Sequence, residues 1–298
     1  IYGLSVIPLF ILMGNLAAYA GLSRDLFLLA SRWVGRMPGG LCISTILACA
    51  GFSTLSGSSL ATAATIGRIS MGEMLKRGYS PSISSGTIAA GGTIGILIPP
   101  SVMLVVYGLL TEQSIREMFA AGILPGVLLT LTFIVTVVVW VRLRPASAPR
   151  ANPNDPRLDV PKAGVLSLVG LVVIVLGGLY AGYFTATESA AVGTLGTLII
   201  AWFRGGLSWK NLAGALTETA STSAMIFFII IGSALYATFL SVTGISGALR
   251  DFVVGCGACL GVSGDFVGLH RAGVLHGLHG DDSADDSCFL SRNGCPGH

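Results

Sequence analysis

The sequence predicts an all-α protein that crosses a membrane several times. Of its 298 residues, 53% are hydrophobic and only 10% are charged, whereas soluble domains average about 25% charged residues. The mean hydropathy is +0.81, and apolar runs of about 20 residues, the length of a membrane-spanning helix, recur along the chain. Segments this apolar need the bilayer as their solvent. The composition therefore excludes an ordinary soluble enzyme and a disordered chain.

The small positive charge does not indicate a nucleic-acid partner. The formal net charge is +3, but the aromatic residues lie in apolar runs rather than among the basic residues that would contact phosphates. Membrane proteins collect Lys and Arg on their cytoplasmic loops because these residues set the topology. We therefore expect the lipid bilayer, and no nucleic acid, around this chain.

The first group of apolar segments is expected over residues 1–141. A span over 1–20 comes first. Residues 21–38 follow, with Arg24, Arg32 and Arg36 between apolar side chains, a pattern typical of an amphipathic helix on the membrane surface. Further spans are expected over 82–111 and 117–141.

Residues 39–71 differ from the other apolar segments because a polar stretch divides them. Each arm has only about 15 residues, which is too short for a full crossing. Two short arms that meet at a Ser/Gly tip predict a re-entrant hairpin, a structure found only where it is buried in protein or lines a cavity. Its candidate ion-binding residues are hydroxyls and a turn glycine: Ser56, Gly57, Ser58, Ser59 and Thr62. The alternative is that these small residues only allow close helix packing.

The span over 82–111 carries helix-breaking residues near its middle. Pro99 and Pro100 have no amide hydrogen, and the glycines before them relax the helix, so we expect an unwound segment. A re-entrant hairpin followed by an unwound span is typical of secondary transporters, although a simple proline kink is the alternative. The candidate binding residues here are Gly92, Thr93, Gly95, Pro99, Pro100 and Ser101.

Residues 142–163 contain five prolines and predict a cytoplasmic linker rather than a helix. Spans over 164–184, 187–203 and 212–242 follow it. If the hairpin enters from the cytoplasm, most of the 17 Lys and Arg residues lie on cytoplasmic segments. Ahead of Arg250, only Arg116 is then expected outside.

Three polar residues in or beside apolar spans are further candidates. Asn15, Thr187 and Glu188 are possible intramembrane polar groups. Because polar groups are costly inside a membrane, such residues are first interpreted as functional. The structural alternative for Glu188 is a first-turn acid behind an N-cap at Thr185. For Asn15 it is a hydrogen bond between helices or an interfacial position.

In combination, five short stretches resemble the large membrane subunit, of DctM type, of tripartite ATP-independent periplasmic (TRAP) transporters. They occur in the family's order over residues 1–254, and Ala186 is the one small departure, since the family usually has proline there. The stretches are Pro8–Leu16, Ser56–Thr62, Gly95–Ser101, Ala121–Gly126 and Gly182–Ala191.

This resemblance implies an elevator-type transporter fold with inverted repeats, each with one re-entrant hairpin and one unwound helix. It implies no enzymatic activity and no cofactor or metal beyond Na⁺ as the coupling ion. The implied partners are a small membrane subunit and a periplasmic substrate-binding protein. The implied function is Na⁺-coupled uptake of small organic acid anions, of C4-dicarboxylate or sialic-acid type, across the inner (cytoplasmic) membrane of a bacterium or archaeon.

The second repeat, expected over 164–254, is incomplete, because no second hairpin motif follows it. Residues 255–298 are instead polar and rich in Gly, Asp and His. Shifted by one base, the codons of residues 271–293 permit the apolar reading VLGCFMDSMAMILLTIPVFFPVM, which contains the missing motif. We therefore expect a frameshift near Gly255 and no transport by the chain as printed. Sequencing the locus tests this expectation, and an intact gene in the printed frame would contradict it.

Two other functions are compatible with parts of the sequence. One is a binding-protein-independent dicarboxylate or ion symporter of the same broad architecture. The other is a membrane-embedded hydrolase with Ser56 or Ser58 as nucleophile. The second needs a general base within reach, and every histidine of the chain lies at or after His270, so we favour a transporter.

Overall fold

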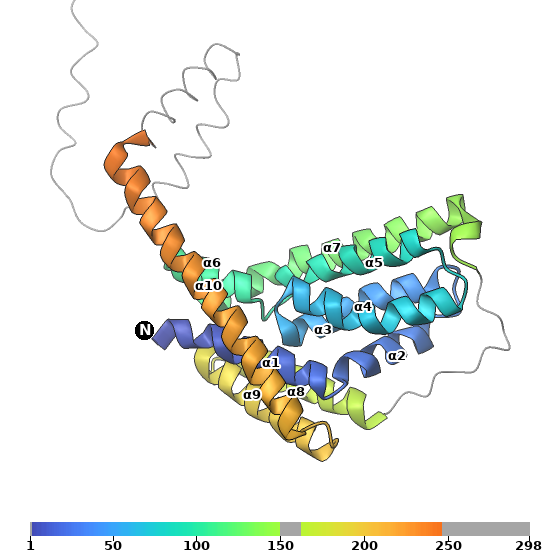
Figure 1. Cartoon of the computed structure of the whole chain (residues 1–298), viewed down its shortest axis with the longest axis horizontal. Coiled ribbons are helices and arrows are strands. Elements are labelled where there is room, and N and C mark those ends of the chain that lie inside the picture. The colour runs from blue at the N-terminus through green and yellow to red at the C-terminus, as the bar shows by residue number, and fades with distance from the viewer. Residues whose placement is uncertain (1, 150–161, 246–298) are drawn as a thin grey trace, which may run out of the picture. The chain divides into compact units, whose positions relative to one another are not determined.

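The computed structural model describes residues 2–149 and 162–245. All regular elements in these residues are helices, as the composition predicts (Figure 1). The chain divides into two compact units, residues 1–228 and 229–298. The helices are η1 (Tyr2–Ser5), α1 (Val6–Tyr19), α2 (Leu22–Val34), α3 (Gly40–Ser56), α4 (Ser59–Lys76), α5 (Pro81–Thr93), η2 (Ile94–Ile96), α6 (Val102–Leu110), α7 (Ile115–Leu143), η3 (Pro145–Ser147), α8 (Lys162–Tyr180), α9 (Ala186–Phe203) and α10 (Trp209–Thr243).

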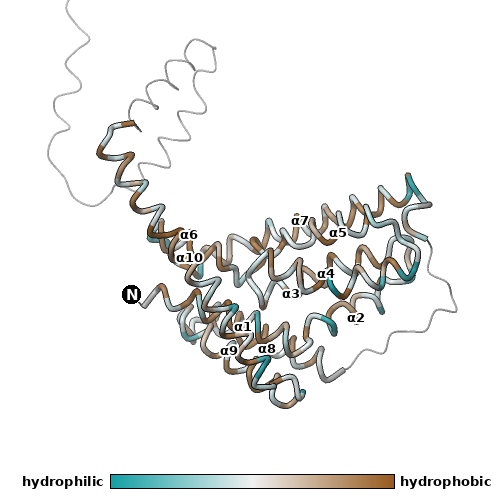
Figure 2. The backbone as a smooth tube through the Cα atoms, in the orientation of Figure 1, coloured by the Kyte–Doolittle hydropathy of each residue, from teal (hydrophilic) through white to brown (hydrophobic). Residues whose placement is uncertain are grey.

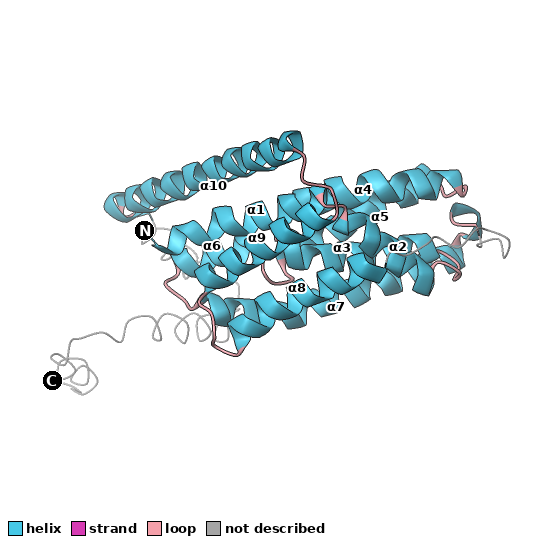
Figure 3. Ribbon diagram, turned by 90° about the horizontal axis from the view of Figure 1, so that it is seen from below, coloured by secondary structure: helices cyan, strands magenta, loops and turns pink. Residues whose placement is uncertain are grey.

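Two groups of helices form the first unit. Helix α9 packs against α1 and α8, while α3, α4 and α5 pack against one another. Helix α2 joins the groups, since it follows α1 directly and packs along α3 (Figures 1 and 3). The largest fully buried side chains include Phe10 and Phe119, whose rings meet edge to face with centroids 6.0 Å apart.

Much of the apolar surface faces outward rather than into the protein, as expected for helices whose solvent is lipid. Figure 2 shows long hydrophobic stretches along the helices. On α7 the exposed apolar side chains include Ile123, Leu124, Val127, Leu128, Leu131, Val135 and Val139. Within the described part of the chain, α7, α9 and α10 are long and apolar enough to cross a membrane.

The expected span over 1–20 is shorter in the structure. Helix α1 has 14 residues, about 21 Å at 1.5 Å per residue, against a bilayer core of about 30 Å. Gly21 ends it in the left-handed region, with φ of 75°, and α2 continues at a bend of 65°. The bent pair is long and apolar enough to count as one span.

Helix α2 is amphipathic, as the sequence indicates, but part of its surface is covered by protein. Phe27 is fully buried, and the Leu26 side chain lies against Gly51 of α3. Asp25 is also buried, with only 4% of its surface exposed. The pattern of alternating basic and apolar residues could not distinguish packing on α3 from packing on lipid, because both surfaces are apolar.

The hairpin arms are α3 and α4, which pack against each other. Gly57 ends α3 with φ of 56°, a conformation that L-residues with side chains rarely adopt. Ser58 then begins α4 as its N-cap, because its Oγ accepts from the Ala61 amide at 3.4 Å. Helix α4 continues to Lys76, five residues beyond the predicted end at 71.

Residues 255–298, the segment for which we expect a shifted frame, lie outside the described residues. So does most of the predicted linker over 142–163, of which the structure describes residues 142–149 and 162–163.

Candidate functional site

The hairpin tip lies directly against the break between α5 and α6. The amide of Val102, the first residue of α6, donates to the Gly57 carbonyl oxygen at 3.1 Å. A Cβ placed on Gly57 would lie 2.7 Å from the Pro100 carbonyl oxygen. A Cβ on Gly95 would lie 3.0 Å from the Ser58 carbonyl oxygen. The two predicted sites therefore form one site, built mainly from backbone.

Buried hydroxyls stabilise both halves of this site. Ser56 Oγ and Thr62 Oγ1 are 2.6 Å apart, and both residues are buried. This hydrogen bond ties the end of α3 to the first turn of α4. In the break, Ser101 Oγ donates to the Ile96 carbonyl oxygen at 2.5 Å, and the same hydroxyl accepts from the Leu104 amide at 3.5 Å, as the N-cap of α6.

The break is shorter than the sequence predicts. Helix α5 continues through Thr93, and a 3₁₀ turn covers Ile94–Ile96, so Gly92 and Thr93 belong to a helix rather than to an unwound segment. Gly92 still faces the tip, since a Cβ there would lie 3.2 Å from the Ser59 carbonyl oxygen. Thr93 is exposed, and its Oγ1 donates to the Ala90 carbonyl oxygen within α5. The Thr93 hydroxyl is therefore used within its own helix.

Four helix ends meet where the tip contacts the break. Helices α3 and α5 end there, and α4 and α6 begin there. Helix C-termini carry partial negative charge from their free carbonyls, and helix N-termini carry partial positive charge. The geometry thus offers a cation and an anion adjacent positions in one site.

Three glycines that were not among the candidate binding residues pack closely against this site, although they lie within the stretches that carry the family resemblance. A Cβ on Gly14 of α1 would lie 2.6 Å from the Ser56 Cα. On α7, a Cβ on Gly122 would lie 2.6 Å from the Leu97 carbonyl oxygen, and one on Gly126 would lie 2.9 Å from the Ile98 side chain. The spacing of Gly122 and Gly126 is common in glycine-rich membrane helices, so the spacing alone could not single them out.

The three polar candidates outside the hairpin lie away from the tip. Asn15 Nδ2 donates to Thr219 Oγ1 of α10 at 3.0 Å, which is the helix-to-helix alternative. Glu188 accepts from the Thr185 amide at 2.8 Å, and its own amide donates to Thr185 Oγ1. Together these form a capping box at the start of α9, the structural alternative for Glu188. Thr187 lies in the same first turn.

Replacing Thr185 with alanine tests this structural role. Loss of the cap is expected to destabilise the start of α9 by about 1 kcal/mol and to lower the apparent melting temperature of the purified chain slightly. Thr187→Ala, in the same turn without the N-cap position, is the matched control. An equal shift in both variants would contradict the cap.

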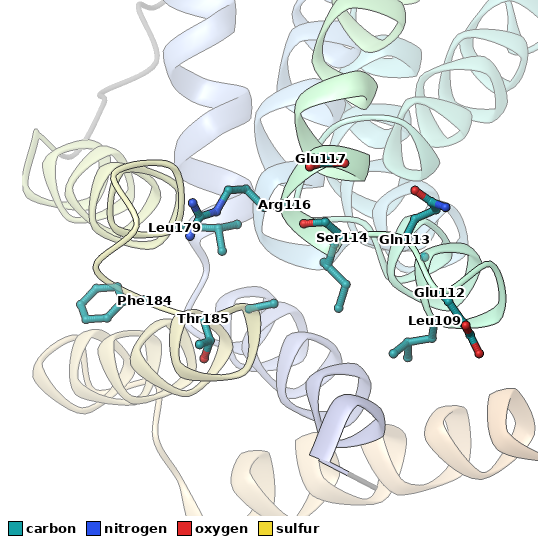
Figure 4. Close-up of a pocket in the computed structure, with 12 residues that line it drawn as sticks. Leu109, Glu112, Gln113, Ser114, Arg116, Glu117, Leu179, Phe184 and Thr185 are labelled. Atoms are coloured by element: carbon teal, nitrogen blue, oxygen red, sulfur yellow. The ribbon is translucent and has the colours of Figure 1, made fainter. Parts of the chain in front are cut away.

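A separate cavity of about 560 Å³ lies between the α6–α7 turn and the α8–α9 turn (Figure 4). Its lining includes Gln113, Ser114 and Arg116 from one turn and Phe184 and Thr185 from the other. Figure 4 shows Arg116 extending toward Leu179 of α8. The cavity contains none of the residues of the hairpin tip or of the break.

Residues 2–262 match the family described as "Tripartite ATP-independent periplasmic transporter, DctM component". The chain belongs to the DctM family. As a DctM chain it is a multi-pass membrane protein, and the relatives below are named as transporter permeases rather than as enzymes.

Several relatives of this DctM chain have established names. It is 37% identical over 260 residues to a C4-dicarboxylate TRAP transporter large permease of Pseudomonas aeruginosa, an alignment that covers 86% of this chain and 60% of the relative. It is 32% identical over 253 residues to a sialic acid TRAP transporter large permease of Vibrio cholerae, covering 84% of this chain and 59% of the relative. An isethionate TRAP transporter permease of Oleidesulfovibrio alaskensis is 33% identical over 256 residues, covering 85% and 40%. This DctM chain thus spans about three-fifths or less of the length of these relatives.

Proposed function

We propose that the chain is part of a large permease subunit that takes up small organic acid anions together with Na⁺. The observation that carries this proposal is the contact of the hairpin tip with the helix break. Broken helices in transporters bind ions with unwound carbonyls and with half-helix ends. Carbonyl oxygens of the break and the hydroxyls of Ser56 and Ser58 are hard oxygen ligands of the kind Na⁺ accepts.

The same site has places for both the ion and the anion. The C-terminal ends of α3 and α5 favour a cation, whereas the N-terminal ends of α4 and α6 favour a carboxylate. A bound Na⁺ adds positive charge beside the substrate, so each ligand strengthens the binding of the other. This is the physical basis that we propose for coupled uptake.

The remaining parts of the proposal follow from family membership. The relatives' names include C4-dicarboxylate and sialic acid, both organic acid anions, so we propose a substrate of this class. The family description names a tripartite periplasmic system, which supports a small membrane subunit and a periplasmic substrate-binding protein as partners. We place the complex in the inner membrane and propose an elevator-like movement of the hairpin group.

A chimera tests the proposal without requiring the whole protein. Residues 2–254 of this chain would replace the aligned part of the P. aeruginosa C4-dicarboxylate permease, and uptake of a labelled dicarboxylate would be measured with and without Na⁺. We expect uptake that requires Na⁺. Uptake at the same rate in K⁺ as in Na⁺ would contradict the proposal that Na⁺ is the coupling ion.

In this chimera, Ser56→Ala is expected to weaken Na⁺ dependence. The change removes a hydroxyl oxygen that we propose as a Na⁺ ligand and leaves the Thr62 hydroxyl without its 2.6 Å partner. Losing about 1.4 kcal/mol of Na⁺ binding would raise the Na⁺ concentration for half-maximal uptake about tenfold. Ser58→Ala should act in the same direction. The control is Ser70→Ala in α4, whose hydroxyl bonds only within its own helix, to the Ile66 carbonyl oxygen. An unchanged Na⁺ dependence in both tip variants would argue against the hairpin site.

A further inference from the structure

A buried ion pair joins α2 to the end of α9. Asp25 Oδ2 and Arg204 Nη1 are 2.5 Å apart, and their side chains are 5% and 28% exposed. The atoms are not aligned as a hydrogen bond, since Asp25 Oδ2 has no hydrogen-bond partner by geometry. The contact is therefore an ionic one between two residues that are distant in the sequence.

Three helix ends favour the charges of this pair. Asp25 lies in the first turn of α2, and its carboxylate also lies beside Gly164 in the first turn of α8. Arg204 is the C-cap of α9. Helix dipoles stabilise an acid at an N-terminus and a base at a C-terminus, so each charge lies at helix ends whose partial charge is opposite to its own.

The ion pair leaves no room for a side chain at Gly164 of α8. A Cβ on Gly164 would collide with the Asp25 carboxylate and would lie 2.7 Å from Arg204 Nη1. The backbone of α8 thus closes the third side of the ion pair. Three segments that are distant in the sequence meet at this one point.

The pair lies where the two helix groups of the first unit are joined. Helix α2 packs along α3, the first hairpin arm, whereas α8 and α9 belong to the other group. The hairpin tip is held by α1 through Gly14. The C-terminal end of α2 adjoins the base of the hairpin, since a Cβ on Gly40 would meet the Val34 carbonyl oxygen, whereas Asp25 lies in the first turn of α2. The pair therefore fixes the opposite end of α2, and α2 links this fixed point to the hairpin base.

We propose that Asp25 and Arg204 are positioning residues that form an ionic joint, which sets the place of the hairpin base relative to α8 and α9. The inference goes beyond the proposed transport function, and its test needs neither Na⁺ nor substrate. A failure of the joint and a failure of the transport proposal are therefore separate results.

The test is a distance measurement in the purified full chain. Spin labels would be attached at Lys76→Cys, near the hairpin base, and at Leu195→Cys on α9, since both positions are exposed. The cysteines of residues 255–298 would be replaced by alanine, and Cys42 and Cys49 are buried. Double electron–electron resonance then reports the distribution of distances between the two spin labels.

The decisive variant removes both charges at once. Removing one partner leaves an uncompensated buried charge, which destabilises the fold, whereas removing both avoids this penalty. We expect Asp25→Asn/Arg204→Gln to fold with a broader distribution of distances and so to lose the distribution of the unsubstituted chain. Arg204→Lys, which keeps the charge, should retain it, and so should Arg24→Gln, which removes an exposed neighbouring charge.

An unchanged distribution of distances in the folded double variant would overturn the proposal. So would an equal broadening in Arg24→Gln, because the effect would then not belong to the pair. If the double variant failed to fold while Arg204→Lys folded with an altered distance, the joint would also be contradicted, since charge would not be the property that sets the position.

Discussion

Replacing Gly57 with alanine is expected to reduce Na⁺-dependent uptake in the chimera strongly. Gly57 has φ of 56°, where a side chain costs roughly 1–2 kcal/mol. Its Cβ would also lie 2.7 Å from the Pro100 carbonyl oxygen and 3.1 Å from the Val102 nitrogen. Both are backbone atoms, so the tip has to leave the break to make room. We expect uptake to fall by about tenfold or more, since about 1.4 kcal/mol is already a factor of ten.

A matched control separates backbone strain from collision. Gly21 also has a positive φ, of 75°, but no atom lies within 4 Å of a Cβ placed on it. Gly21→Ala therefore introduces the same kind of strain without the contact, and we expect it to retain most of the uptake. Equal losses in the two variants would show that strain, rather than the contact between the tip and the break, explains the effect.

Replacing Gly14 with alanine is expected to destabilise the chain, although alanine favours helices. The new methyl group would lie 2.6 Å from the Ser56 Cα and 3.1 Å from the Leu55 carbonyl oxygen. Overpacking of this kind costs about 1–3 kcal/mol, more than the gain of up to about 1 kcal/mol from helix propensity. Thermal unfolding of the purified chain in detergent measures the balance.

The control for Gly14 is a glycine inside α5. Gly86 has no atom within 4 Å of a Cβ placed on it, so Gly86→Ala gains helix propensity and loses nothing. We expect the two substitutions to shift the apparent melting temperature in opposite directions. A rise in both would contradict the close contact between α1 and the hairpin tip.

Features that depend on neighbouring residues could be predicted from the sequence. The hairpin turn follows from a glycine between two serines, and the helix break follows from Pro99 and Pro100, because each residue type acts on its own stretch of backbone. The capping alternative for Glu188 also depends on a spacing of three residues. Membership of the DctM family agrees with the resemblance recognised from five short motifs.

Features that depend on distant residues could not be predicted in this way. The sequence does not show that Gly14 has to be a glycine. That requirement comes from Ser56, which lies directly against it in the fold. From the sequence, Asp25 is expected on the polar face of a surface helix. Its ionic partner, Arg204, comes from the end of α9, far along the chain. Helix α5 continues to Thr93 even though it contains Gly86, Gly91 and Gly92, since packing against the hairpin outweighs weak helix propensity.

The central claim is that the hairpin tip and the helix break form a Na⁺ site, and thermal unfolding of the purified chain in Na⁺ and in K⁺ tests it most directly. A ligand that binds only the folded state stabilises it, by about 2.7 kcal/mol at a concentration of one hundred times its Kd. We predict a higher melting temperature in NaCl than in KCl at equal ionic strength, and a smaller difference in Ser56→Ala. Identical melting temperatures of the unsubstituted chain in the two salts, up to the highest concentration tested, would contradict the claim.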